Sequence, residues 1–203
     1  HRPMSSLETK LLIGGEQVAG EGAAIEVENP FTEETIATVN APSDEQLGAA
    51  IGAAREASAE WMPTPAVDRG ELLHELANRI EGRTDELAEV MTMEGGKPLI
   101  ENRDEVSWVV ACFRYYAEIG RDSAGRVIPS IEASQLALVL KEPHGVWGCI
   151  VPWNYPLLLL AWKLAPAVAA GNTLVCKPSE LTPISTLMLA ECLDHLPAGV
   201  VNI

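Results

Sequence analysis

Residues 145–180 read GVWGCIVPWNYPLLLLAWKLAPAVAAGNTLVCKPSE, and this stretch decides the fold. The apolar run Val146–Val151 predicts a strand buried on both faces, and two prolines then force extended geometry. Pro156 suits the first position of a helix, which should end before a left-handed cap at Gly171. Thr173–Cys176 predicts a second buried strand. A polar side chain therefore follows each strand, at the edge where open parallel α/β sheets bind ligands.

The residues after this stretch continue the same alternation. Thr182-Pro183 predicts an N-cap and the first residue of a helix, and Val200–Ile203 predicts the start of a third strand. Residues 145–203 thus spell β-α-β-α-β, which is half of a doubly wound nucleotide-binding sheet. Half of so apolar a sheet would leave large apolar edges exposed, so we expect the sequence to be part of a longer chain.

The residues before it divide into β structure and helices. Residues 11–41 predict a hairpin that turns at Gly14-Gly15, followed by two further strands. Ser43 and Gln46 form a capping box at the start of a helix that ends near Trp61. Apolar stripes predict three more helices, over residues 72–80, 87–96 and 106–125, and we expect these helices to cover the sheet.

The segment Ile128–Glu142 has a weak alternation of period two and predicts an exposed, extended strand that could pair with another chain. The expected organisation is a tag remnant at residues 1–3, a β and helical part over 4–127, an oligomerisation strand over 128–144, and the first Rossmann-like βαβαβ unit over 145–203.

Composition narrows the class of protein. The chain has 203 residues, 47% of them hydrophobic, which is typical of a globular protein. Its 29 acidic and 14 basic residues give a formal charge of -15, which disfavours nucleic-acid and membrane-surface binding. The four cysteines form no CxxC pair, so no metal site is expected, and we interpret them as reduced thiols of a cytoplasmic protein. The most apolar segment, Leu157–Ala170, is too short to span a membrane.

The segment Val151–Pro156, with AWKLAPAVAAGNTLVCKPSELTP after it, closely resembles the NAD(P)-dependent aldehyde dehydrogenase superfamily. Asn29-Pro30, the Glu94–Pro98 turn and the Leu196–Asn202 turn extend the resemblance over nearly the whole chain. It implies the N-terminal portion of the aldehyde dehydrogenase fold: an incomplete Rossmann-like doubly wound α/β sheet with covering helices and an oligomerisation strand. It also implies a homodimer or homotetramer in the complete protein.

The resemblance assigns the oxyanion hole to Asn154, whose side-chain amide would stabilise the charge on the aldehyde oxygen. On its sequence alone, a turn former between prolines is the better interpretation of Asn154. Tyr155 and Trp162 are expected to share one helix face and to line the aldehyde tunnel. They could hold a quaternary ammonium group, as in betaine aldehyde dehydrogenases, although core packing is an alternative for Trp162.

The resemblance also implies contacts with NAD. Lys177 and Glu180 would hold the adenosine ribose hydroxyls, and the Glu180 carboxylate would favour NAD over NADP because it repels a 2′-phosphate. The expected cofactor-binding set is Ile150, Val151, Pro152, Trp153, Lys177, Ser179 and Glu180. A solvated loop and strand-end core are the structural alternatives for these residues.

Three positions, Val27, Glu94 and Leu181, resemble the surroundings of a structural monovalent cation in some relatives. We favour the simpler interpretation, in which Glu94 is an exposed residue of a turn, and we expect no metal site.

The family's nucleophilic cysteine, its general-base glutamate and its glycine-rich turn should all lie beyond Ile203. None of Cys112, Cys149, Cys176 and Cys192 has the sequence context of that nucleophile. We expect the parent protein to oxidise an aldehyde to a carboxylic acid through a cysteine thiohemiacetal, and this chain alone to be inactive. The alternatives are a nucleotide-binding fragment without catalysis and a scaffolding protein that associates through residues 128–142.

Overall fold

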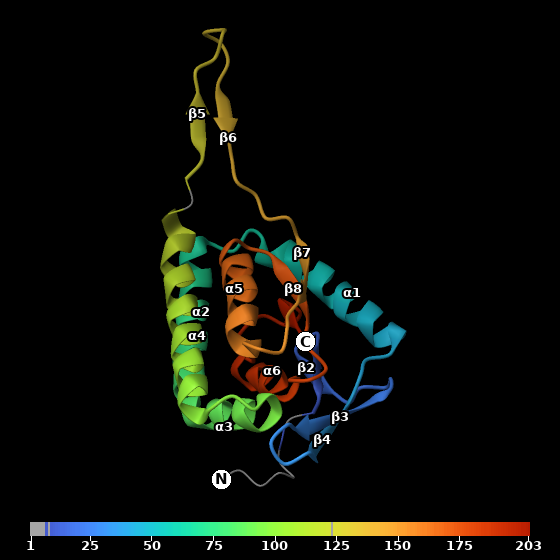
Figure 1. Cartoon of the computed structure of the whole chain (residues 1–203). Helices are drawn as coiled ribbons and strands as arrows, with labels where there is room; N and C mark the ends of the chain where they lie inside the picture. Colours follow the sequence, from blue (N-terminus) through green and yellow to red (C-terminus); the bar gives the residue numbers. More distant parts are fainter. Residues whose placement is uncertain (1–6, 8, 123) are drawn as a thin grey trace.

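The computed structural model describes residues 7, 9–122 and 124–203 (Figure 1). The tag remnant expected at residues 1–3 lies outside the described residues. At the centre of the fold is a three-stranded parallel sheet in the order β7-β8-β9. Its strands are Val146–Ile150, Thr173–Lys177 and Val201–Asn202. This order confirms the predicted β-α-β-α-β alternation. Within the described residues, no helix has the length and apolar character that crossing a membrane requires.

Two helices flank this sheet. Helix α5 (Pro156–Ala169) joins β7 to β8 and lies against one face, while α1 (Asp44–Trp61) lies against the other (Figure 1). The α1 contact includes a buried hydrogen bond from Thr173 Oγ1 to the carbonyl oxygen of Ala54, at 2.8 Å. The predicted capping box starts α1, because Ser43 and Gln46 each accept a hydrogen bond from the other's backbone N–H. Gly171, with φ 88°, follows α5 in the expected left-handed conformation.

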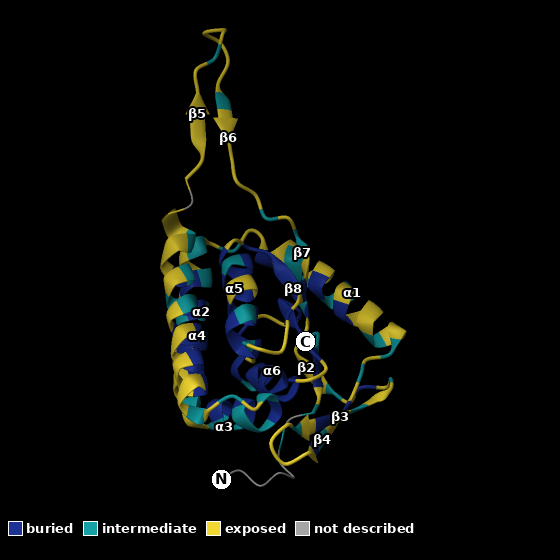
Figure 2. Cartoon of the chain, viewed as in Figure 1, coloured by how far each residue is buried: buried dark blue, intermediate teal, exposed yellow. Residues whose placement is uncertain are grey.

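The next three helices do not cover the sheet directly, which corrects our expectation; the first and the third pack over α5, and the second packs against the third. They are α2 (Ala66–Glu81), α3 (Thr84–Gly95) and α4 (Leu99–Ile119), with a 3-10 turn, η2, at Gly120–Asp122. Helices α2 and α4 pack on each other and on α5, whose Leu157, Leu160 and Leu164 are fully buried. Figure 2 shows the result, with buried residues concentrated in α5, α6 and the inner faces of α2 and α4.

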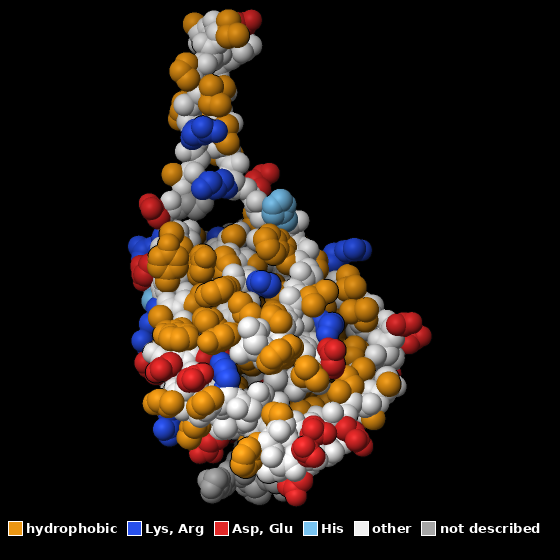
Figure 3. Space-filling view, in the orientation of Figure 1, with side chains coloured by type: hydrophobic (Ala, Val, Ile, Leu, Met, Phe, Trp, Pro, Cys, Tyr) orange, Lys and Arg blue, Asp and Glu red, His pale blue; other side chains and the backbone are white. Residues whose placement is uncertain are grey.

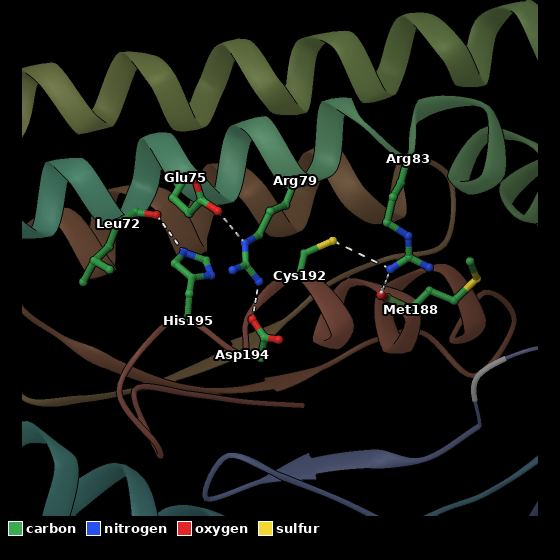
Figure 4. Close-up of polar contacts among 8 residues, drawn as sticks. All are labelled: Leu72, Glu75, Arg79, Arg83, Met188, Cys192, Asp194 and His195. Carbon is green, nitrogen blue, oxygen red and sulfur yellow. Dashed lines mark hydrogen bonds and ion pairs between the residues drawn. The ribbon is translucent and has the colours of Figure 1, made fainter.

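Polar contacts fasten α2 to the end of the βαβαβ unit, around α6 (Ile184–Leu189) and the 3-10 turn η3 (Ala190–Cys192). In Figure 4, Arg79 bridges Glu75 and Asp194, while Arg83 reaches the carbonyl oxygen of Met188 at 3.1 Å and the Cys192 sulfur at 3.8 Å. His195 Nε2 lies 2.9 Å from the carbonyl oxygen of Leu72. These links fix the helical layer relative to the sheet.

The N-terminal β structure also joins the sheet. Strands β1 (Leu11–Ile13) and β2 (Glu16–Val18) form the predicted hairpin, with Gly14 and Gly15 at positive φ. Leu12 and Ile203 exchange two backbone hydrogen bonds of 2.9 Å, which attach β1 beside β9. A second antiparallel pair, β3 (Ala24–Asn29) and β4 (Glu34–Asn40), follows as expected.

Three local predictions were wrong. Strand β7 is buried on one face only, with Cys149 buried and Ile150 71% exposed, because α5 covers one face while a cavity separates the other face from α1. The segment 128–142 is not one strand but part of a hairpin, β5 (Arg126–Ile128) with β6 (Ala137–Val139), which projects from the body (Figure 1). Helix α6 begins at Ile184, and Thr182 does not cap it.

Candidate functional site

The candidate site is the sheet edge where β7 and β8 end. The backbone N–H of Val151 donates to the carbonyl oxygen of Lys177 at 3.1 Å, so the segments that follow the two strands start side by side. The turn after β7 presents Asn154 to solvent, and the loop after β8 presents Glu180. Thr182 Oγ1 donates to the carbonyl oxygen of Trp153 at 3.4 Å and links the turn to the loop. One sheet edge therefore carries both predicted groups.

The start of α5, directly after Asn154, is fixed by a residue that the sequence analysis missed. Tyr155 occupies the N-cap position, but its side chain makes no capping hydrogen bond. Instead, Glu105 Oε1 from α4 accepts the backbone N–H groups of Leu157 and Leu158, both at 3.1 Å. Glu105 is fully buried and forms an ion pair with Lys97. A buried carboxylate at a helix N-terminus satisfies free donors and complements the helix dipole.

Glu94 has the same role at α6, which corrects the expectation of an exposed turn residue. Its side chain is buried, and its two oxygens accept the N–H groups of Ile184 at 2.7 Å and Ser185 at 3.0 Å. Burial raises the pKa of Glu94 to about 7. Of its suggested partners, Val27 is buried in β3 and Leu181 is exposed. In the described part of the chain, no three His, Cys, Asp or Glu side chains gather as metal ligands would.

A cavity of about 780 Å³ lies between α1 and the open face of β7 and β8. Of the predicted cofactor residues, Ile150, Lys177, Ser179 and Glu180 line it. Val151 is buried beneath the edge, while Pro152 and Trp153 are exposed and do not line the cavity. The lining therefore combines an apolar sheet face with a polar rim.

The rim is formed by an ion pair at the end of β8. Lys177 Nζ lies 3.5 Å from Glu180 Oε2 and donates to the carbonyl oxygen of Pro178 at 2.9 Å. The backbone N–H of Glu180 and the Lys177 ammonium lower the pKa of the Glu180 carboxyl. Ser179 Oγ is committed to the loop, where it accepts the N–H of Leu181 at 3.2 Å. An ionised carboxylate beside an apolar face fits an adenosine group, because the ribose hydroxyls can donate hydrogen bonds and the flat faces of the adenine ring can stack on apolar side chains.

A second cavity, of about 810 Å³, brings Tyr155 and Trp162 together as predicted. Its wall on α5 also includes Leu158 and Leu159, and its wall on α4 was not foreseen. The α4 wall consists of Trp108, Cys112, Tyr115 and Tyr116. None of these lining side chains carries a formal charge at neutral pH. Figure 3 shows hydrophobic side chains gathered across this part of the molecule and along the projecting hairpin.

The α4 residues could have been found from their spacing. Trp108, Cys112 and Tyr115 follow one another at intervals of four and three, so they share one helix face. That face lies beside the buried stripe of α4, which consists of Val106, Val109, Val110, Phe113 and Ala117. Only the buried stripe was used to predict the helix. An aromatic stripe next to a buried one indicates a helix with two packed or partly packed sides.

Comparison with known proteins gives the family. Residues 17–203 match the model of the aldehyde dehydrogenase family. The chain belongs to this family. It is 39% identical over 198 residues to betaine aldehyde dehydrogenase from Bacillus subtilis, an alignment that covers 95% of this chain and 40% of that protein. The chain thus spans about two-fifths of the length of the relatives that it matches.

Solved aldehyde dehydrogenase structures confirm the fold class. A betaine aldehyde dehydrogenase variant from Staphylococcus aureus, in complex with NAD⁺, superposes with a TM-score of 0.92 at 35% identity and covers 97% of this chain and 41% of its own. An NADP-dependent enzyme from Escherichia coli superposes with a TM-score of 0.94 at 36% identity and covers 99% and 42%. The fold is therefore the N-terminal part of the aldehyde dehydrogenase fold.

Proposed function

We propose that this chain is the N-terminal, cofactor-binding part of an NAD-dependent aldehyde dehydrogenase and supplies the oxyanion donor, Asn154. The observation that carries the proposal is the shared sheet edge, where the Asn154 turn and the Lys177–Glu180 loop follow adjacent parallel strands. Relatives over nearly the whole chain are aldehyde dehydrogenases, which supports the same reaction class.

Glu180 determines the cofactor in this proposal. When bound, NAD would accept a hydride from the substrate. The exposed, ionised Glu180 would accept hydrogen bonds from the two adenosine ribose hydroxyls, and Lys177 would donate to the same sugar. A 2′-phosphate would meet the Glu180 carboxylate and be repelled, so NAD is favoured over NADP. The relatives include both an NAD⁺ complex and an NADP-dependent enzyme, so this preference rests on Glu180.

Asn154 determines the chemistry at the aldehyde. Its amide N–H can donate to the substrate oxygen as negative charge develops there, and a fixed neutral donor stabilises that charge. The aldehyde's substituent would lie in the aromatic cavity of α4 and α5. Because the named lining is uncharged and rich in aromatic rings, it suits an apolar or quaternary ammonium group better than a carboxylate.

The chain alone is proposed to lack dehydrogenase turnover. Catalysis needs a thiolate nucleophile, and burial raises the pKa of the Cys112 thiol to about 11, so that thiol stays protonated at neutral pH. Cys149, Cys176 and Cys192 are buried. NAD-dependent oxidation of an aldehyde panel by the purified chain, above the solvent background, would contradict this.

Calorimetric titration with NAD tests the cofactor site in the chain itself. We expect wild-type binding that weakens at least tenfold in Glu180→Ala and is unchanged in Glu132→Ala, which removes an exposed carboxylate from the β5–β6 hairpin. NADP should bind more weakly than NAD to wild type, and that preference should disappear in Glu180→Ala. Equal NAD affinity in the wild type and the Glu180 variant would contradict the assignment.

The projecting hairpin is the proposed oligomerisation element. Its exposed apolar side chains include Val127 at 73%, Ile131 at 103% and Leu138 at 51% exposure. A strand edge with such side chains can pair with a second copy. The same hairpin would serve the alternative in which the protein is a scaffold without catalysis, and an NAD titration without any binding would favour that alternative.

A further inference from the structure

Lys97 lies between the buried Glu105 and the aromatic ring of Tyr155. Its ammonium nitrogen is 3.8 Å from the centre of that ring and forms an ion pair with the Glu105 carboxylate. We propose that Lys97 is a positioning residue that holds the Tyr155 ring in the wall of the aldehyde cavity. The inference rests on the proposed function, because it assigns Tyr155 to the substrate pocket.

The position of Lys97 is fixed from both ends. Its backbone lies in the short turn between α3 and α4, where fully buried Asn102 donates to its carbonyl oxygen at 3.4 Å and to Thr92 Oγ1 at 2.9 Å. Its ammonium meets Glu105, whose other oxygen caps α5. A lysine side chain that is 21% exposed and held at both ends has lost most of its rotamer freedom, so it offers the ring a stationary cation.

Among the described residues, no hydrogen bond orders the Tyr155 side chain, so its ring needs another support. It is the N-cap residue of α5, with φ -138° and ψ 67°, and its side chain makes no capping bond. The ring is half-buried and lines the cavity with Trp162 and Trp108. A cation over a ring face favours one ring orientation, and this attraction strengthens when the cation is partly desolvated.

The arrangement also limits how the cavity can treat a charged substrate. One face of the Tyr155 ring is already occupied by the Lys97 ammonium, so a substrate cation can use only the remaining surface of that ring. Trp108 and Trp162, which are 50% and 56% exposed, have no such occupant among the described aromatic and cation contacts. Lys97 is therefore expected to act through Tyr155 and not by touching the substrate.

The geometry is tested first in the chain itself by NMR. The sequence contains five lysines, so selective ¹³C-lysine labelling gives a simple spectrum. We expect the ε-methylene resonances of Lys97, assigned by Lys97→Arg, to be shifted upfield by the Tyr155 ring and to return to the ordinary position in Tyr155→Leu. Unshifted Lys97 resonances in the wild type would overturn the inference.

The role is tested by a double-mutant cycle in the complete enzyme. We expect Lys97→Met to raise KM for the aldehyde about tenfold, with KM for NAD unchanged, and to have no further effect in the Tyr155→Leu background. Lys141→Met, which removes an exposed ammonium after β6, is the matched control and should change neither constant. If Lys97→Met fails to fold, Lys97→Arg replaces it in the cycle, because a planar guanidinium keeps the charge but moves it over the ring.

The experiments distinguish a failure of the positioning role of Lys97 from a failure of the proposed function. An equal effect of the Lys97 substitution in the Tyr155→Leu background, or a parallel rise in both KM values, would overturn the positioning role while leaving the proposed function intact. An enzyme that oxidises no aldehyde would overturn the proposed function and this inference together, whatever the NMR spectrum shows.

Discussion

Replacing Glu94 by glutamine would separate two opposing effects on a buried carboxylate. Glu94 is completely buried and receives the N–H groups of Ile184 and Ser185 at the start of α6. These donors favour the ionised form, whereas burial favours the neutral form. Burial dominates and raises the pKa from its ordinary value of 4.5 to about 7. Glutamine has nearly the same size but cannot titrate.

The expected magnitude follows from this shift. Because the folded carboxyl binds its proton more tightly than the unfolded one, the contribution of Glu94 to stability is fully present below about pH 4.5. It is lost as the pH rises through about 7. A shift of roughly 2.5 pKa units corresponds to about 3 kcal/mol of unfolding free energy, of which about 2.5 kcal/mol is lost between about pH 5 and 8.

The assay is urea unfolding of the wild type and Glu94→Gln at several pH values between about 5 and 8. Every other titrating group is common to both proteins, so the difference between their unfolding free energies isolates Glu94. We expect that difference, wild type minus variant, to fall by about 2.5 kcal/mol as the pH rises. A difference that grows with pH would show that the two backbone donors outweigh burial, and would refute the reasoning.

Three further outcomes are expected. Glu105→Gln should lower the unfolding free energy by about 3 kcal/mol, because it leaves Lys97 without its buried partner. Asp85→Asn removes one partner of an exposed ion pair with Arg103 and should lower the unfolding free energy by less than about 1 kcal/mol. Urea unfolding measures both changes. Cys149, Cys176 and Cys192 are buried and should react with Ellman's reagent far more slowly in the native protein than in denaturant, and rapid native labelling of any thiol besides the half-buried Cys112 would contradict their burial. Leu138→Glu on the hairpin should lower the mass measured by light scattering to that of a monomer, while Ile100→Glu on α4 should not; an unchanged mass for both would exclude the hairpin as the interface.

The part of the fold that depends on local patterns could be predicted from the sequence. The Ser43 capping box, the Gly14-Gly15 turn and the α5 boundaries at Pro156 and Gly171 each involve residues within a few positions of one another. The same holds for the candidate site, because the ends of two strands joined by one helix must meet at one sheet edge.

The two capping glutamates could not be predicted in this way. Glu105 caps α5 from 52 residues away and Glu94 caps α6 from 90 residues away, so no local pattern links either to its helix. At α5 the absence of a Ser, Thr, Asp or Asn side chain at the cap was the available signal, since free N–H donors in a buried helix start require a distant acceptor; at α6 no such signal was available, because Thr182 suggested a local cap.

The β5–β6 hairpin was missed for a different reason. The weak apolar alternation of Leu136–Lys141 covers only the second strand, and extending it back to Ile128 suggested one long strand. The turn between the two strands was marked by Pro129 and Ser130, and Ser130 Oγ accepts the N–H of Glu132 at 3.3 Å within that turn. A proline and a serine between two apolar runs indicate a reversal of the chain, and this should have outweighed the alternation.

The capping glutamates also constrain where a dinucleotide can lie. In most Rossmann-like sites the first helix after a strand binds the pyrophosphate through its free N–H groups. Here Glu105 already accepts the N–H groups of Leu157 and Leu158 at α5, so these donors are not free for a phosphate. In the proposed function, the pyrophosphate would therefore be held away from the start of α5, which agrees with the lack of a GxGxxG turn before that helix. The part of a dinucleotide that this proposal gives to the chain is the adenosine end, which Lys177 and Glu180 would contact at the rim of their cavity.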